Sequence, residues 1–163
     1  MMLALQVFAV LLVAIAMALA LAHALELPGK LRLSKEEYLV VQPIYYPGFT
    51  VGGAAEPLAL VVVLALMLLT PQRTAFWLTA GALAALVLMH AAYWLVTHPV
   101  NKFWLRDTAL IGAGAGFFAF DPLRREGRAA DWTALRDRWE FSHVVRASLG
   151  VVSLILLVAA VAV

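Results

Sequence analysis

The chain has 163 residues, of which 64% are hydrophobic and only 13% are charged. A soluble domain of this length could not bury so much apolar surface, whereas lipid can solvate long apolar runs that a small core cannot cover. The formal net charge of +2, with basic residues scattered among acidic ones, argues against nucleic acid as a partner and leaves the lipid bilayer as the bulk partner. Cysteine is absent, which excludes disulfides, thiolate metal sites and cysteine nucleophiles.

The first apolar run extends from Met1 to about Leu25 and carries no charge. Its length matches a hydrocarbon core of roughly 30 Å at about 1.5 Å per helical residue, so we predict a first membrane span over residues 3–25. The motif Ala22-His23-Ala24 also resembles a signal-peptide cleavage site. A basic segment before the apolar run is missing and the run is long for a signal peptide, which favours the spanning helix.

Polar residues and prolines then predict that the chain leaves the membrane over residues 26–53. Ser34 and Glu37 have the spacing of a capping box, which predicts a short helix through Val41. Three prolines are expected to break regular structure in this segment, namely Pro28, Pro43 and Pro47.

The second and third spans are predicted as an antiparallel hairpin over residues 54–70 and 75–97. Pro57 suits a helix start, and Thr70-Pro71-Gln72-Arg73 reads as a tight turn. Thr74 is the expected N-cap of the third span. Pro99 is expected to end that span near His98, because the residue before a proline disfavours helical geometry.

The last span is predicted over residues 142–162, in a helix that begins at Asp131 or Thr133 and continues to Val163. Before it lies a glycine-rich apolar segment, Leu110 to Phe120, which is too short to span and would lie on the membrane or dip into it. The expected fold is thus a single all-α domain, an integral membrane four-helix bundle with two long loop segments on one side.

Charge predicts the orientation of this bundle in a cell membrane. Four spans place both termini and the short turn on one side, where Arg73 is the one basic residue, and the two long segments on the other. The long segments carry ten basic residues: Lys30, Arg32, Lys35, Lys102, Arg106, Arg124, Arg125, Arg128, Arg136 and Arg138. The positive-inside rule therefore predicts that the long segments are cytoplasmic.

Most of the ionisable residues near the membrane are predicted to lie on this same side of the bundle. Glu56 is expected at the start of the second span, where a solvated carboxylate beside a helix N-terminus is an alternative interpretation. Six other ionisable residues and Asn101 are expected to converge in space: His23, Glu26, His98, Asn101, Glu140, His143 and Arg146. Because a guanidinium cannot shed its charge, we expect Arg146 to pair with Glu140 or Glu26.

Two pairs of these residues have the spacing of metal ligands on a helix face. His23 and Glu26 form one pair and Glu140 and His143 the other, which suggests a transition metal held by nitrogen and oxygen, as in di-iron bundles. The match is partial, because the Glu-x-x-His motif occurs once forward and once reversed. Haem held by two histidines, and no cofactor at all, remain alternatives.

Helix three carries a stripe of His90, Trp94, His98 and Asn101 at spacings of four, four and three. His90 and His143 stand within apolar runs, where each needs a polar partner. Tryptophans in this chain are expected mainly at the membrane interface, as belts formed by Trp77, Trp94, Trp104 and Trp139.

Two short motifs resemble a known family. Pro99-Val100-Asn101-Lys102 follows a membrane helix. The motif Trp139-x-x-x-His143-x-x-Arg146 lies at the start of the last helix. With His23-Ala-Leu-Glu26-Leu-Pro28, these motifs resemble the anthrone oxygenase-like family of small four-helix membrane proteins, most of which have no assigned function; many members have a second Asn where this chain has Lys102.

The resemblance implies an oxygenase that uses dioxygen to oxidise an activated methylene of a polycyclic phenolic ketone, hence a hydrophobic small molecule as partner. It implies His143 or His98 as the base, with Arg146 and Asn101 as donors to the enolate oxygen. The alternative is a non-catalytic membrane protein, either a transporter or a partner subunit. Small residues such as Ala147 and Gly150 would permit contact with a partner or a second copy.

Overall fold

The computed structural model describes residues 2–104, 117 and 131–163, and these residues are helical apart from short turns. Four helical segments are long and apolar enough to cross a membrane: Met2–Lys30, Gly48–Leu69, Arg73–Asn101 and Trp132–Ala162. The all-α prediction is thereby confirmed, with four candidate spans in the expected order. The glycine-rich segment 110–120 lies outside the described residues except for Phe117.

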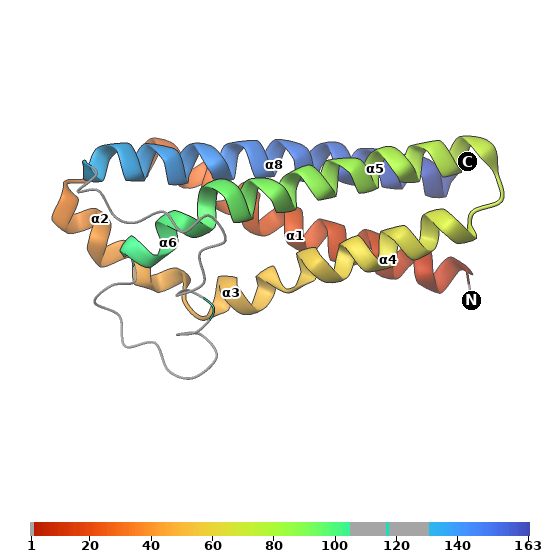
Figure 1. Ribbon diagram of the computed structural model, residues 1–163, viewed down its shortest axis with the longest axis horizontal. Helices are drawn as coiled ribbons and strands as arrows, with labels where there is room; N and C mark the ends of the chain where they lie inside the picture. The colour runs from red at the N-terminus through yellow and green to blue at the C-terminus, as the bar shows by residue number, and fades with distance from the viewer. Residues whose placement is uncertain (1, 105–116, 118–130) are drawn as a thin grey trace.

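The four long helices form a closed bundle (Figure 1). Helix α8 (Trp132–Ala162) packs against α1 (Met2–Lys30) and α5 (Arg73–Ala92), while α4 (Ala55–Leu69) packs against the same two helices from the opposite side. Both termini and the α4–α5 turn lie at one end of the bundle, and the short helices α2 (Lys35–Val41) and α6 (His98–Trp104) lie at the other. The predicted hairpin and the position of the termini at one end agree with this arrangement.

Small residues allow the helices to approach closely in the bundle core. Gly150 of α8 lies so close to α1 that a Cβ atom there would sit 3.1 Å from the Cα atom of Met17. Ala147, one turn earlier, is also buried. Both residues therefore pack within the chain. The alternative of a partner subunit had predicted that they contact a partner or a second copy, and the structure does not leave them free for this.

The first and third spans both continue past a proline that was predicted to end them. Helix α1 runs through Pro28 to Lys30. Its last turn is held by Lys30, whose ammonium contacts Glu26 in α1 and Glu140 in α8. Contacts between helices thus offset the loss of one backbone hydrogen bond at the proline.

Pro99 is accommodated by a change of helix type. The π-helical segment η2 (Tyr93–Thr97) connects α5 to α6, so that one continuous helical rod extends beyond His98. Pro99 has no N–H to offer the Leu95 carbonyl, and the guanidinium of Arg138 donates to that carbonyl instead, at 3.3 Å. The helix therefore does not end before Pro99 as predicted, although the candidate span ends close by, at Asn101.

The second span begins earlier than predicted, because α3 (Gly48–Gly53) leads directly into α4. Glu56 consequently stands well inside a membrane-length helix rather than at its start. The capping box of α2 forms as predicted, and Asp131 caps α8. Gln72, rather than Thr74, is the N-cap of α5, since its side chain accepts from the Ala75 N–H.

Candidate functional site

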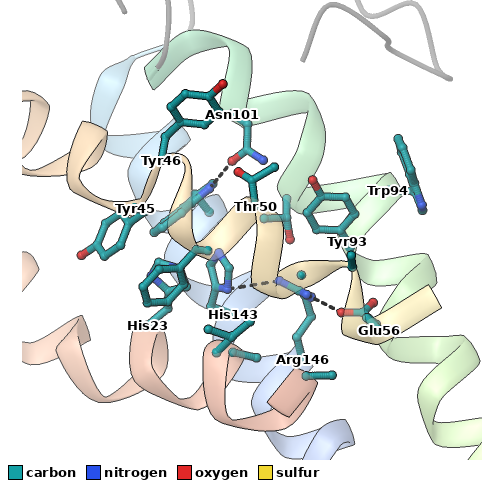
Figure 2. Close-up of a pocket in the computed structure, with 18 of the residues that line it drawn as sticks. His23, Tyr45, Tyr46, Thr50, Glu56, Tyr93, Trp94, Asn101, His143 and Arg146 are labelled. Atoms are coloured by element: carbon teal, nitrogen blue, oxygen red, sulfur yellow. Dashed lines mark hydrogen bonds and ion pairs between the residues drawn. The ribbon is translucent and has the colours of Figure 1, made fainter. Parts of the chain in front are cut away.

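A cavity of about 550 Å³ opens at the end of the bundle that carries α2 and α6 (Figure 2). Its walls come from α1, the 3₁₀ segment η1 (Gln42–Tyr45), α3, α4, α5, η2, α6 and α8. Most of the lining is apolar or aromatic, and the polar part includes His23, Gln42, Thr50, Glu56, His90, Asn101, His143 and Arg146. The volume is that of sites for drug-sized ligands.

A buried ion pair lies in the wall of this cavity. The Nη2 atom of Arg146 is 2.6 Å from the Oε2 atom of Glu56, and both side chains are buried. The pair joins α8 to α4 in a low-dielectric setting, where each charge needs the other. Arg146 was predicted to pair with Glu140 or Glu26, and this was wrong because Glu56 faces the bundle interior.

Glu56 also accepts a hydrogen bond from His90, whose Nδ1 atom is 3.0 Å from Oε1. The other nitrogen of that ring, Nε2, accepts from the indole N–H of Trp94 at 3.0 Å. An indole N–H can only donate, so Nε2 carries no proton and His90 is a neutral imidazole that donates through Nδ1. The Glu56 carboxylate is thus oriented by a cation on one oxygen and a neutral donor on the other.

N–H groups of neighbouring side chains also orient His143 and Asn101. Each of the two keeps N–H groups of its own that can donate. The Nδ1 atom of His143 lies 3.3 Å from Nη1 of Arg146, which can only donate, so the ring proton resides on Nε2. The Oδ1 atom of Asn101 accepts from the Trp139 indole at 2.7 Å, which places the amide NH₂ on the opposite side of the group. Both residues line the cavity, and so does Arg146. All three were among the predicted site residues.

The unpaired polar atoms of the site are almost all donors. In the described part of the chain, five buried side-chain atoms lack a hydrogen-bond partner: Gln42 Nε2, Trp104 Nε1, Glu140 Oε2, His143 Nε2 and Arg146 Nε. The four nitrogens belong to residues that line the cavity, and each is a donor. These atoms are themselves buried, so their lack of a partner is a cost within the walls, and a ligand in the cavity would meet other N–H groups of the lining.

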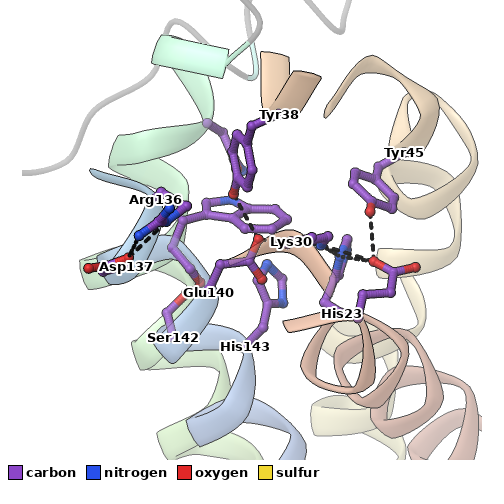
Figure 3. A network of polar contacts seen from close by, with 12 residues as sticks. His23, Lys30, Tyr38, Tyr45, Arg136, Asp137, Glu140, Ser142 and His143 are labelled. Atoms are coloured by element: carbon purple, nitrogen blue, oxygen red, sulfur yellow. Dashed lines mark hydrogen bonds and ion pairs between the residues drawn. The ribbon is translucent and has the colours of Figure 1, made fainter. Parts of the chain in front are cut away.

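A second polar cluster adjoins the cavity and centres on a lysine (Figure 3). Lys30 is only 4% exposed, and its Nζ atom lies 2.9 Å from Glu26 and 3.5 Å from Glu140. It also stands over the rings of Tyr45 and Trp139, at 4.7 and 4.8 Å from their centroids. From the sequence, Lys30 was predicted to be one of the charges of a long loop segment. Its spacing of four from Glu26 is typical of an ion pair on a helix and could have indicated this contact.

Two tyrosines complete this cluster from outside the spans. The Tyr38 hydroxyl donates to Glu140 at 2.8 Å, and the Tyr45 hydroxyl donates to Glu26 at 2.6 Å. Burial, together with these carboxylates, raises the pKa of both phenols above the usual value, so both remain hydrogen-bond donors. Glu140 is fully buried, with the Tyr38 hydroxyl and the Lys30 ammonium as its partners.

The predicted metal set does not assemble in the described residues. The rings of His23 and His143 meet, with centroids 4.2 Å apart, but Glu140 is directed to Lys30 and Tyr38 instead. Among the residues that the structure places, no group of three or more His, Asp or Glu side chains could hold a metal ion. The four residues of the predicted set, His23, Glu26, Glu140 and His143, therefore lie near one another around Lys30 but do not form a metal centre.

His98 and the tryptophans also differ from their predicted positions. His98 is buried behind Tyr93, whose hydroxyl is 3.2 Å from its Nδ1 atom, and it lies outside the cavity lining. The π-helical segment shifts the register of the helix, so the expected stripe is interrupted at this residue. Trp94, Trp104 and Trp139 line the cavity, and Trp77, which is 64% exposed, retains the position of an interface residue.

No protein-family model, curated protein or solved structure matches this chain. The resemblance to the anthrone oxygenase-like family therefore stays a prediction.

Proposed function

We propose that this chain is a membrane oxidoreductase of the anthrone oxygenase-like kind, which acts on a hydrophobic aromatic ketone. The observation that carries the proposal is the donor set of the cavity. Arg146, His143 and Asn101, whose side chains carry N–H groups, line an otherwise apolar and aromatic cavity of about 550 Å³. A flat aromatic ligand with several acceptor oxygens would satisfy both the apolar walls and the donors.

The resemblance supplies the reaction class. A base removes a proton from the activated methylene, and the electron pair enters an enolate whose oxygen needs donors. The carbanion adds dioxygen, and the resulting hydroperoxide loses water when its remaining C–H and its O–O bond break. The balance is one methylene plus one dioxygen to one carbonyl plus one water, so no further reductant is needed.

Several contacts in the site support this chemistry. Arg146 is held by Glu56 beneath the cavity, and the Asn101 amide is held by Trp139, so both are ordered donors before a ligand binds. Preorganised donors at a developing oxyanion are often the largest single contribution to catalysis. The surrounding aromatic side chains would exclude water from the enolate.

We also propose that the cavity end of the bundle faces the cytoplasm. The support is the charge distribution, since the segments at that end carry nearly all the basic residues and the α4–α5 turn carries Arg73. The substrate would then reach the cavity from the cytoplasm or from the inner leaflet.

The test is oxygen uptake by the full chain in lipid nanodiscs with anthrone as the probe. We expect one dioxygen consumed per anthrone and anthraquinone as product. In the double variant Arg146→Gln/Glu56→Gln, which replaces the ion pair by an amide pair, we expect kcat/KM to fall about 10²-fold to 10³-fold. The matched control is Arg73→Gln at the exposed far turn, which should leave the rate unchanged. A wild-type protein without oxygen uptake above empty nanodiscs would refute the proposed function.

A further inference from the structure

The lining of the cavity reaches the surface of the bundle on the side of the second and third spans. Ala54 and Pro57 are exposed, whereas every other described residue of the lining is buried or half-buried. Ala54 stands at the junction of α3 and α4, and Pro57 lies in the first turn of α4. From the third span, the half-buried Trp94 of η2 lines the cavity as well. These three residues mark the rim of a side opening.

The helices on the two sides of this rim do not close over it in the described part of the chain. Helix α3 packs on α1, η1 and α4, while η2 packs on α5, α6 and α8. Thr50 of α3 and Tyr93 of η2 nevertheless line the same cavity. Below the rim, the hydrogen bond between Glu56 and His90 joins α4 to α5, and beyond it α3 bends away from the third span (Figure 1). The opening therefore lies between α3 and η2.

The end of the cavity that points along the bundle toward α2 is covered by aromatic side chains. Tyr38, Trp104 and Trp139 belong to one apolar cluster between α2, α6 and α8, and all three are buried. Trp104 and Trp139 also line the cavity, as does the buried Gln42. A ligand that entered from this end would have to displace part of that cluster.

The side opening lies at the depth of the hydrocarbon core. Counted at about 1.5 Å per residue, Pro57 lies about 13 Å from Gly48, where the second span begins, and Trp94 lies about 10 Å from Asn101, where the third span ends. Next to the rim, Leu58 is an apolar side chain that is 45% exposed, so the rim continues into the lipid-facing surface of the span.

The charges of the lining favour an uncharged ligand. Apart from histidines, Arg146 and Glu56 are the ionisable basic and acidic side chains among the described lining residues, and they form an ion pair with each other. The pair leaves no net charge to attract an anion or a cation. A charged ligand would also lose its hydration in the lipid before it reached the rim.

From this geometry we infer that the ligand enters the cavity sideways from the bilayer, between α3 and η2, and is an uncharged aromatic molecule dissolved in the lipid. The aromatic class of the ligand rests on the proposed function. The inference narrows the entry from cytoplasm or inner leaflet to entry from the lipid.

The surroundings of the rim can be measured without any ligand. Because the chain has no cysteine, bimane attached to Ala54→Cys labels the rim alone in the full chain in nanodiscs. We expect quenching by doxyl-labelled phosphatidylcholine and little quenching by iodide. Val61→Cys, at a position of α4 that is 65% exposed, should behave alike, and Lys35→Cys at an exposed position of α2 should show the reverse. Quenching of the Ala54 label by iodide as at Lys35, or protection from both quenchers, would overturn the inference.

Binding kinetics test the route itself, with 1,8-dihydroxyanthraquinone as the probe in stopped-flow measurements. In Ala54→Phe we expect the association and dissociation rate constants to fall together by about tenfold with Kd little changed, because a narrower entrance raises one barrier for both directions. Val61→Phe, two turns along the same helix face and outside the lining, should change neither rate.

Tyr46→Ala separates this route from entry out of water. Tyr46 follows η1 and lines the cavity, and we expect its truncation to leave the association rate constant unchanged. Faster association in Tyr46→Ala, together with an unchanged rate in Ala54→Phe, would overturn the side entrance. If the wild type does not bind the probe, the proposed class of ligand fails, and the quenching measurement still decides whether the opening faces lipid.

Discussion

Replacing Glu56 with glutamine is expected to lower the free energy of unfolding by about 3–5 kcal/mol. The substitution leaves the Arg146 guanidinium inside the bundle without its counter-charge, and the carboxylate that accepts from His90 is lost as well. In the exposed glutamate Glu36 of α2, the same change from Glu to Gln should cost little. Unfolding in mixed micelles with increasing dodecyl sulfate measures both variants against the wild type.

A second variant shows whether the cost comes from the unpaired charge. When Glu56→Leu is combined with Arg146→Met, neither charge remains, and most of the stability should return. The single substitution Arg146→Met should be as damaging as Glu56→Gln, because it leaves the carboxylate unpaired. A cost below about 1 kcal/mol for Glu56→Gln would mean that the buried pair does not stabilise the bundle.

Replacing Lys30 with methionine is expected to have an effect of the same size. Glu140 is fully buried and would keep the Tyr38 hydroxyl as partner but lose its cation. Lys30 also fixes the turn of α1 that follows Pro28. We expect a loss of about 3–5 kcal/mol in the same unfolding measurement.

The control for this prediction is Lys35→Met, which removes an exposed lysine at the start of α2 and should change stability by less than about 0.5 kcal/mol. Adding Glu140→Gln to Lys30→Met removes the stranded charge and keeps an acceptor for Tyr38, so part of the loss should be regained. If Lys30→Met and Lys35→Met cost the same, the cluster contributes nothing beyond a surface charge.

The spans were predictable from the sequence because hydrophobic length alone determines them. The run from Met1 to Leu25 has few alternatives in a bilayer, and the short turn at Thr70 fixes the hairpin. The rules that failed were those for proline. Pro28 and Pro99 were predicted to end their helices, yet long-range contacts of Lys30 and Arg138 support the helix at both positions.

The candidate site could be predicted only in part. His143, Arg146 and Asn101 were found because their positions in the apolar runs fix the depth of each side chain. Depth does not determine which way a helix is rotated, so the partner of Arg146 was missed. Glu56 would have been the expected partner had α3 been recognised as the first turns of the second span.

Tautomers depend on distances that no single-sequence pattern contains. The motif at Glu140 and His143 suggested a shared metal, whereas the structure directs the carboxylate to Lys30 and the imidazole to Arg146. The choice between ligand, base and donor for a histidine is made by the one or two atoms that face its nitrogens.

The most direct test of the central claim, that the cavity holds an oxygen-bearing aromatic ligand at Arg146, is equilibrium binding of 1,8-dihydroxyanthraquinone to the full chain in nanodiscs. Quenching of tryptophan fluorescence reports it, since Trp94 and Trp139 line the cavity. We expect saturable binding of one ligand per chain, unchanged in Trp77→Phe and weakened about 10-fold to 100-fold in Arg146→Gln/Glu56→Gln. Quenching that does not saturate, or that is the same in the double variant, would contradict the account.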